Sequence, residues 1–258
     1  MLRIKLVDPT DILSVENFCN GKLLGTKILC LLKAYGLDTP FLTVWYGTDE
    51  DENTAAVICN FDGNVTVIEE CKDDIEELSA FLDFVGWSSL CCTERTSVRL
   101  RYDNAVIKNA YMYNGEESGC FLDELTEDYY KKCYMLICEN IPDSFEDSRE
   151  AYLSFLSDFT YRKRRNLARM KGYTENGNLY SCALTSAETE EAAIISGVAC
   201  DMSARKSGLG KKTVLSIVEE LQKEGKDVYV IALNEAAEGF YEHIGFRFTE
   251  QISFIERK

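Results

Sequence analysis

The sequence has 258 residues, 46% of them hydrophobic, which is enough to bury the core of one large domain or two modest ones. Its formal net charge of −16 argues against a nucleic acid as partner, because phosphate backbones are bound through excess lysine and arginine. No apolar run is long enough to cross a bilayer, and residues 1–13 lack the apolar core of a signal peptide, so we expect a cytoplasmic protein without a membrane partner.

The cysteines and the single histidine limit the possible chemistry. The 11 cysteines form no C-x-x-C pair, and many lie in apolar runs, which is typical of buried free thiols in a reducing compartment. His243 is the one histidine, so we expect no metal site, and catalysis of the Cys–His or Ser–His–Asp type has one possible base.

The first half of the chain predicts a helix, three strands, a second helix and a fourth strand. The first helix covers 21–36 and ends at Gly36. Asp62-Gly63 predicts a tight turn between the second and third strands, and Asp73 and Asp74 lie at the start of the second helix. The predicted strands are 41–47, 53–61, 64–70 and 88–92, and the second helix is 73–86.

An acidic, turn-rich segment over 113–132 separates this half from the next, and we place the domain boundary within it. The predicted domains are 1–128 and 129–258. The second half repeats the order of the first, which hints at an old duplication. Its predicted elements are helix 147–159, strands 168–174, 178–187 and 192–201, helix 208–225, strand 227–233, helix 235–244 and strand 246–256.

A short glycine loop precedes the helix at 208–225. Walker and dinucleotide fingerprints both fail here, because Arg205 and Thr213 stand where each pattern requires glycine. What remains is Arg205-x-x-Gly208-x-Gly210 at a turn from strand to helix. Lys211 and Lys212 add positive charge to a helix start that is already positive, which favours an anion in front of it.

This pattern resembles motif A of the GNAT superfamily of N-acetyltransferases, Arg/Gln-x-x-Gly-x-Gly/Ala. A second stretch, 234–246, is similar to the family signature N-x-x-A-x-x-F-Y-x-x-x-G-F. The resemblance covers roughly residues 140–258. It implies an α/β (α+β) fold with a mixed, mostly antiparallel central sheet flanked by helices, here as two tandem GNAT-like domains of which the N-terminal one is degenerate.

The resemblance implies acetyl-CoA as cofactor. Gly208 and Gly210 would let backbone N–H groups converge on its diphosphate, and Gly197 could allow a bulge in the strand that runs beside the pantetheine arm. The first half has an acidic helix start without glycine, so one cofactor site is expected. The implied cofactor-binding residues are Val198, Cys200, Arg205, Lys206, Ser207, Gly208, Leu209, Gly210, Lys211, Asn234, Phe240 and Tyr241.

Two catalytic roles follow from the resemblance. Tyr241 matches the tyrosine that protonates the departing CoA thiolate; its alternative role is to pack beside Phe240. Glu190 and Glu191, with Asp201, are candidate bases for the amine, directly or through water, and are otherwise solvated charges at strand ends. His243 is expected on the surface.

The implied activity is transfer of an acetyl group to a primary amine by direct attack in a ternary complex. The alternatives are a non-catalytic CoA-binding regulatory or interaction module and an acyltransferase that uses a longer acyl-CoA. The acceptor, a small-molecule or peptide amine, is not specified by the sequence, and monomer and homodimer both stay open. A basic cluster over 161–171 could bind an acidic acceptor or the ribose phosphate of CoA, or form a solvated helix end.

Overall fold

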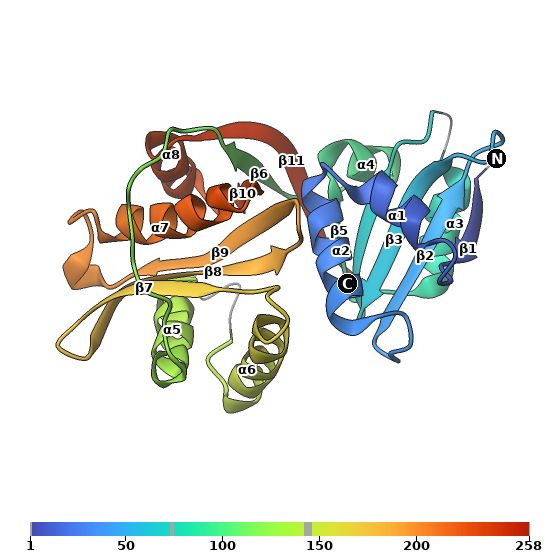
Figure 1. Ribbon diagram of the computed structural model, residues 1–258. Coiled ribbons are helices and arrows are strands. Elements are labelled where there is room, and N and C mark those ends of the chain that lie inside the picture. Colours follow the sequence, from blue (N-terminus) through green and yellow to red (C-terminus); the bar gives the residue numbers. More distant parts are fainter. Residues whose placement is uncertain (1, 73–74, 142–145, 258) are drawn as a thin grey trace. The chain divides into compact units, whose positions relative to one another are not determined.

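The computed structural model describes residues 2–72, 75–141 and 146–257 (Figure 1). The chain divides into two compact units. The first comprises residues 1–111, 231–238 and 248–258, and the second residues 112–230 and 239–247. This division differs from the predicted boundary between residues 128 and 129, which falls inside the second unit, because segment 112–128 makes its contacts there and the end of the chain returns to the first unit.

The first unit is built on a sheet in the order β1-β2-β3-β4-β5, followed by the last residues of β11. Strands β4 and β5 are parallel, whereas residues Ile252–Glu256 of β11 pair antiparallel with β5. The elements are β1 (Arg3–Leu6), α1 (Ile12–Cys19), α2 (Leu23–Tyr35), β2 (Leu42–Thr48), β3 (Thr54–Phe61), β4 (Asn64–Glu69), α3 (Glu76–Val85), β5 (Ser89–Thr93) and α4 (Glu94–Arg99).

Local sequence explains several of these elements. Asp62 and Gly63 form the two-residue turn of the β3–β4 hairpin, and their positive φ angles of 50° and 81° are those that such a turn needs. Helix α2 ends at Gly36, also with positive φ. Asp73 and Asp74, predicted at the start of α3, lie outside the described residues.

The second unit contains the predicted repeat of helix, three strands, helix and strand. Strands β7, β8 and β9 are antiparallel, and β9 pairs parallel with β10. The elements are α5 (Glu127–Asn140), α6 (Arg149–Lys163), β7 (Met170–Glu175), β8 (Asn178–Glu188), β9 (Ala192–Cys200), η1 (Met202–Ala204) and α7 (Leu209–Lys223). Residues of both units occur in β6 (Val106–Tyr113), β10 (Asp227–Ile231), α8 (Glu235–His243) and β11 (Phe246–Glu256).

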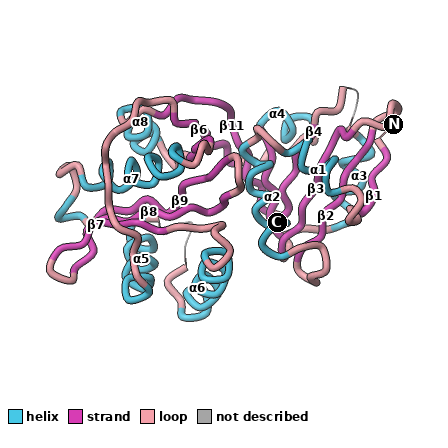
Figure 2. The backbone as a smooth tube through the Cα atoms, viewed as in Figure 1, coloured by secondary structure: helices cyan, strands magenta, loops and turns pink. Residues whose placement is uncertain are grey.

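Helices cover both faces of the sheet in the second unit, with α5 and α6 on one face and α7 on the other (Figure 2). The core under α5 includes Ile137, Phe159 and Cys182, each at most 1% exposed. The mixed α/β fold with a mostly antiparallel sheet and flanking helices is therefore confirmed.

Helix α5 and strand β6 were not predicted from the sequence. The acidic and lysine-rich stretch before Lys132 was interpreted as turns, but Tyr130, Cys133, Tyr134 and Ile137 recur at helical spacing and all four are buried. The helix therefore has a buried apolar face, whereas the charged residues at its start favour a turn-rich segment.

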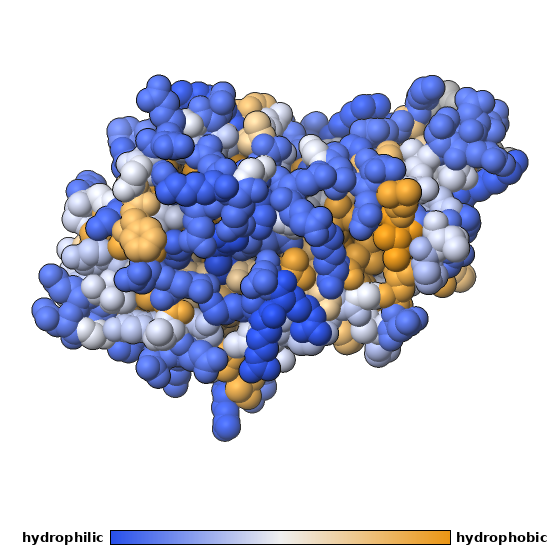
Figure 3. Space-filling model, viewed as in Figure 1, coloured by the Kyte–Doolittle hydropathy of each residue, from blue (hydrophilic) through white to orange (hydrophobic). Residues whose placement is uncertain are grey.

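The surface is mostly hydrophilic, in agreement with the high charge of the sequence. Hydrophilic side chains cover most of the face seen in Figure 3. Within the described ranges, we find no helix with the length and apolar character needed to span a bilayer.

Candidate cofactor site

Strands β9 and β10 separate at their carboxyl ends. Their parallel pairing runs from Ala192 and Asp227 to Ile195 and Val230. Beyond this point β9 continues for five residues, from Ser196 to Cys200, and over the described residues the register pairs this part with β8. Because β10 ends at Ile231, the edge of β9 from Ser196 to Cys200 extends past its parallel neighbour, and we call this open edge the fork.

A bulge lies in β9 at the start of this fork. Cys182 pairs with Ala199 and Leu184 with Ser196, so Gly197 and Val198 together oppose one residue of β8. Gly197 has a φ of +55°, and a Cβ there would lie 2.9 Å from Cδ1 of Ile137. Both the backbone conformation and the packing against α5 therefore require glycine, as the sequence predicted.

The direction of the backbone groups at the end of β9 follows from one hydrogen bond. The Asp201 N–H donates to the Tyr180 oxygen at 2.9 Å, so Asp201 faces β8. Because successive residues of a strand point their backbone groups to alternate sides, those of Cys200 face away from β8, and its oxygen accepts from the Arg205 Nε at 3.4 Å. Val198 lies within the bulge, where this alternation is interrupted, so its contact with a ligand stays a prediction.

The glycine loop leads from β9 into α7. Gly208 is the N-cap of α7, with a φ of 87°, and as a glycine it has no side chain with which to cap the helix. The first turn holds no acidic residue, so its free N–H groups meet no carboxylate from within that turn. Deeper in, the hydroxyls of Thr213 and Ser181 are 2.6 Å apart and anchor α7 to β8.

Positive charge surrounds this helix start. Arg205, Lys206, Lys211 and Lys212 are all exposed, and the Lys212 ammonium stands 5.5 Å from the ring centre of Tyr173. Ser207 on the same loop donates its hydroxyl to the Ala204 oxygen. Leu209 and Gly210 open the helix and are half-buried.

Two residues near the loop have environments that the sequence did not reveal. Lys206 has a φ of 62°, the left-handed conformation that favours glycine. Burial raises the pKa of the Cys200 thiol, while the Arg205 guanidinium and the Gly210 N–H act in the opposite direction. The Cys200 side chain thus lies beside the start of α7.

The second family signature, residues 234–246, packs against the glycine loop that carries the first. Phe240 of α8 is in contact range of Gly210, since a Cβ on that glycine would lie 4.0 Å from its Cζ. Tyr241 is 7% exposed, and its ring centre lies 5.4 Å from that of Phe240 and 5.5 Å from that of Phe246. Burial raises the pKa of Tyr241 above its ordinary value. Among the described residues its hydroxyl has no hydrogen-bond partner.

Other predicted residues have local roles or lie elsewhere. Asn234 caps α8, since its Oδ1 accepts from the Ala237 N–H at 3.0 Å. His243 is exposed, as expected. Glu190 and Glu191 precede β9, and the nine residues of that strand place them about 25 Å from its carboxyl end. The structure therefore does not bring these carboxylates to the fork, and their role as base stays a prediction.

Most basic side chains of the cluster over 161–171 form ion pairs with carboxylates of the protein. Arg169 is 9% exposed, and its guanidinium binds Glu188, Glu220 and Glu224 at 2.8–2.9 Å. Lys171 pairs with Glu220 as well. Further pairs join Arg162 to Asp158 and Lys163 to Glu124. These side chains hold β7, β8 and α7 together, so neither the phosphate-binding nor the solvated alternative describes the cluster as a whole.

Comparisons with known proteins bear on this geometry. Residues 176–255 match the model of a family described as FR47-like protein. No curated protein matches the sequence. A GNAT-family acetyltransferase from Colwellia psychrerythraea has a similar structure, with a TM-score of 0.61, 14% identity, and coverage of 99% of this chain and 100% of that one.

Two further solved structures agree. A GCN5-related N-acetyltransferase from Sphaerobacter thermophilus aligns with a TM-score of 0.60 and 12% identity over 99% of this chain and 95% of its own. A tandem GNAT protein from the clavulanic acid biosynthesis pathway aligns with a TM-score of 0.61 and 12% identity, over 99% of this chain and 98% of its own. The chain has the tandem GNAT fold. At these identities the similarity concerns the fold and its two repeated units.

The two GNAT-like units differ at equivalent points. In the first unit the parallel pairing of β4 with β5 ends at Thr66 and Cys91. Beyond it, the Glu69 carboxylate is fully buried, accepts from the Cys71 N–H at 2.9 Å and pairs with Arg99 of α4 at 2.6 Å. Because α4 directly follows β5, this ion pair links the two strand ends, and the fork of the first unit holds a protein salt bridge.

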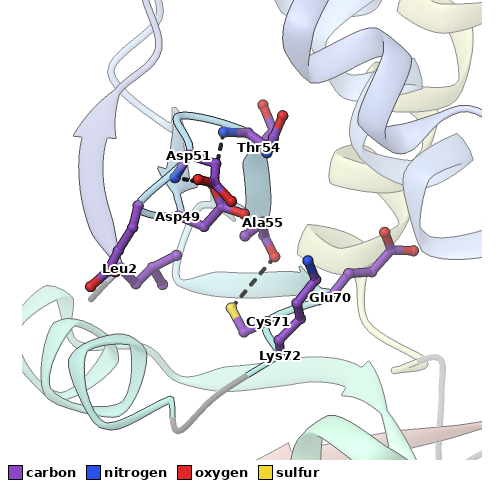
Figure 4. A pocket seen from close by; sticks show the side chains of 10 residues that line it. Leu2, Asp49, Asp51, Thr54, Ala55, Glu70, Cys71 and Lys72 are labelled. Atoms are coloured by element: carbon purple, nitrogen blue, oxygen red, sulfur yellow. Dashed lines mark hydrogen bonds between the residues drawn. The ribbon is translucent and has the colours of Figure 1, made fainter.

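The segment after β4 also has the opposite charge to the glycine loop. It lines a pocket of about 340 Å³ with acidic neighbours, including Asp49, Asp51 and Glu70 (Figure 4). The Asp49 carboxylate accepts from the backbone N–H groups of Asp51 and Asn53. Helix α3 then begins with Glu76 and Glu77. Carboxylates at a helix start and in a pocket repel phosphate.

Proposed function

We propose that this protein is an acyl-CoA-dependent N-acyltransferase that transfers an acetyl group from acetyl-CoA to a primary amine. The observation that carries the proposal is the uncapped start of α7, with Gly208 at positive φ and four exposed basic side chains around it. Helix starts of this kind bind phosphate through backbone N–H groups and the helix dipole.

The residues fit a diphosphate with a pantetheine arm. Added Cβ atoms meet nothing within 4 Å at Gly208 and make only a 4.0 Å contact at Gly210, so the protein's own packing leaves room over both glycines. The backbone groups of Val198 and Cys200 in the adjoining strand β9 are proposed to bind the amide-containing chain. Arg205, Lys206, Ser207, Leu209 and Lys211 would complete the phosphate site, and Asn234 and Phe240 are proposed to lie along the cofactor.

Acetyl-CoA would supply a thioester whose acyl carbon the amine attacks within a ternary complex. A C–N bond forms, the C–S bond breaks, the amine nitrogen loses a proton and the sulfur gains one. Tyr241 is proposed to give the sulfur its proton, since a phenol, whose ordinary pKa is about 10, is protonated at neutral pH.

A backbone N–H at the bulge of β9 is proposed to stabilise the negative charge on the acyl oxygen. Such a donor contributes about 3 kcal/mol in comparable sites. Glu190 and Glu191 act as base in this scheme through water if at all, because the length of β9 rules out direct transfer from the strand's start to its far end.

The first unit is proposed to bind no cofactor, so that one chain binds one CoA. Its fork is linked by Glu69 and Arg99, and its helix start is acidic. We further propose that residues 1–128 are a degenerate domain and residues 129–258 the catalytic one, that the acceptor is a small-molecule or peptide amine, and that the protein acts in the cytoplasm.

Calorimetry and turnover together test this function. We expect CoA to bind with a stoichiometry of one, and acetyl-CoA to release free thiol in the presence of a member of a broad amine panel. Binding without thiol release with any amine would instead indicate a CoA-binding regulatory module. Faster release from longer acyl-CoAs would reassign the acyl group, and absence of CoA binding would refute the proposal.

A further inference from the structure

Arg205 of the glycine loop is held from outside the loop. Its Nη2 donates to Oδ1 of Asn140 at 2.6 Å, and its Nε donates to the Cys200 oxygen at 3.4 Å. Asn140 is the last residue of α5, 65 positions earlier in the chain. The loop side chain is therefore tied both to the fork strand and to a helix on the other face of the sheet.

Asn140 is itself fixed in orientation. Its Nδ2 donates to the Leu136 oxygen at 2.8 Å, which leaves the amide oxygen to face Arg205. An arginine carries N–H donors and no acceptor, so the oxygen is the atom that can bind it. The preceding turn of α5 is buried, with Ile137 at 0% exposure, so Asn140 stands on a rigid base.

We infer that Asn140 is a positioning residue that orients Arg205 toward the cofactor diphosphate, an inference that rests on the proposed function. A guanidinium has five N–H groups, and within the described structure two of them are engaged in these bonds. The remaining three stay available on a side chain that would otherwise be exposed and mobile. Asparagine provides an acceptor without neutralising the charge, which a carboxylate at this position would do.

Two substitutions in α5, Asn140→Leu and Asn140→Asp, separate the effect of the hydrogen-bond acceptor from the effect of added negative charge. Asn140→Leu removes the acceptor at similar size, and we expect it to weaken CoA binding about tenfold, because a hydrogen bond to a charged group contributes a factor of that order. Asn140→Asp keeps the bond but pairs a negative charge with Arg205, and we expect CoA binding to weaken and to depend less on salt. Asn178→Leu makes the matched change at an exposed asparagine of the same unit and should leave binding unchanged.

Calorimetry with CoA, with and without Arg205→Met, decides the inference. Asn140→Leu should have no further effect once Arg205 is replaced, and in turnover it should raise KM for acetyl-CoA while leaving kcat unchanged. In the free protein, NMR relaxation of the Arg205 Nε–H should report greater mobility in Asn140→Leu than in Asn178→Leu.

The outcomes separate the two proposals. If the unaltered protein binds CoA and Asn140→Leu binds it equally well, or if its effect adds fully to that of Arg205→Met, the positioning role is overturned while the proposed function stands. If the unaltered protein binds no CoA, both proposals fall. A loss of melting temperature in Asn140→Leu with unchanged CoA affinity would assign Asn140 a purely structural role, which also overturns the inference.

Discussion

Phe240 of α8 lies against Gly210 of the glycine loop: its Cζ is 4.0 Å from the place a Cβ on that glycine would take. This distance is an ordinary contact, so we predict that Gly210→Ala changes the free energy of unfolding by less than about 0.5 kcal/mol. Gly208 has open space around it but a φ of +87°, so Gly208→Ala should cost about 1 kcal/mol. Urea unfolding of both variants measures these changes. Equal losses in the free energy of unfolding would contradict the prediction that the positive φ of Gly208 makes its substitution more costly.

Lys206 stands in a left-handed conformation, with a φ of 62°, which favours glycine. We predict that Lys206→Gly raises the free energy of unfolding by about 0.5–1 kcal/mol by relieving this strain, while weakening CoA binding through loss of a charge. Lys211→Gly, in the first turn of α7, is the matched control and should lower stability. The prediction is wrong if both substitutions destabilise the protein alike in denaturant titrations.

Tyr241→Phe tests the proposed acid. The substitution keeps the ring contacts with Phe240 and Phe246, so fold and CoA affinity should be unchanged. We expect turnover of acetyl-CoA to fall about 100-fold, the usual contribution of a general acid. Tyr173→Phe is the control, and it should retain full turnover. Equal activities of the unaltered protein and Tyr241→Phe would remove the tyrosine from the mechanism.

The ion-pair network around Arg169 predicts a loss of stability in acid. Hydrogen bonds from Arg169 lower the pKa of Glu224 to about 2, below its ordinary 4.5. A depressed pKa means that the stabilisation is complete above about pH 4.5 and is lost as the pH falls toward 2. Melting temperatures between pH 2 and 7 should therefore fall less steeply for Glu224→Gln than for the unaltered protein.

Glu242→Gln, at an exposed position of α8, is the matched control for this pH series. Its profile should follow that of the unaltered protein. Parallel curves for all three proteins would show that Glu224 is not a source of the acid sensitivity.

The last strand of the chain is predicted to stabilise the first unit. Ile252 is 0% exposed and pairs with Thr93 of β5, so Ile252→Ala should cost about 3 kcal/mol and speed amide exchange in β5. Phe254, 36% exposed on the same strand, is the control, and Phe254→Ala should cost about 1 kcal/mol or less. Hydrogen exchange that changes nowhere in Ser89–Thr93 would contradict the pairing.

Much of the fold and the candidate site could be predicted because their signals are local. The hairpin turn at Asp62-Gly63, the end of α2 at Gly36 and the bulge at Gly197 each depend on backbone conformations that few residues adopt. The glycine loop and the aromatic signature are likewise short patterns. Helix α5 is hard to predict because it begins with Glu127 and Asp128 and follows an acidic, turn-rich segment, although its apolar residues recur at helical spacing.

What required the tertiary structure was the set of contacts between residues distant in sequence. The basic cluster could not be assigned from composition, because its partners Glu220, on α7, and Glu224, the C-cap of α7, lie about 50 residues further along. The hold of Asn140 on Arg205 and the pairing of β11 with β5 are of the same kind. Backbone preferences are set by each residue and its neighbours, so the sequence determined the turns, most of the succession of helices and strands along each half, and the glycine loop. Ion pairs and strand partners depend on which segments the fold brings together, so the tertiary structure alone decided where each charge is neutralised.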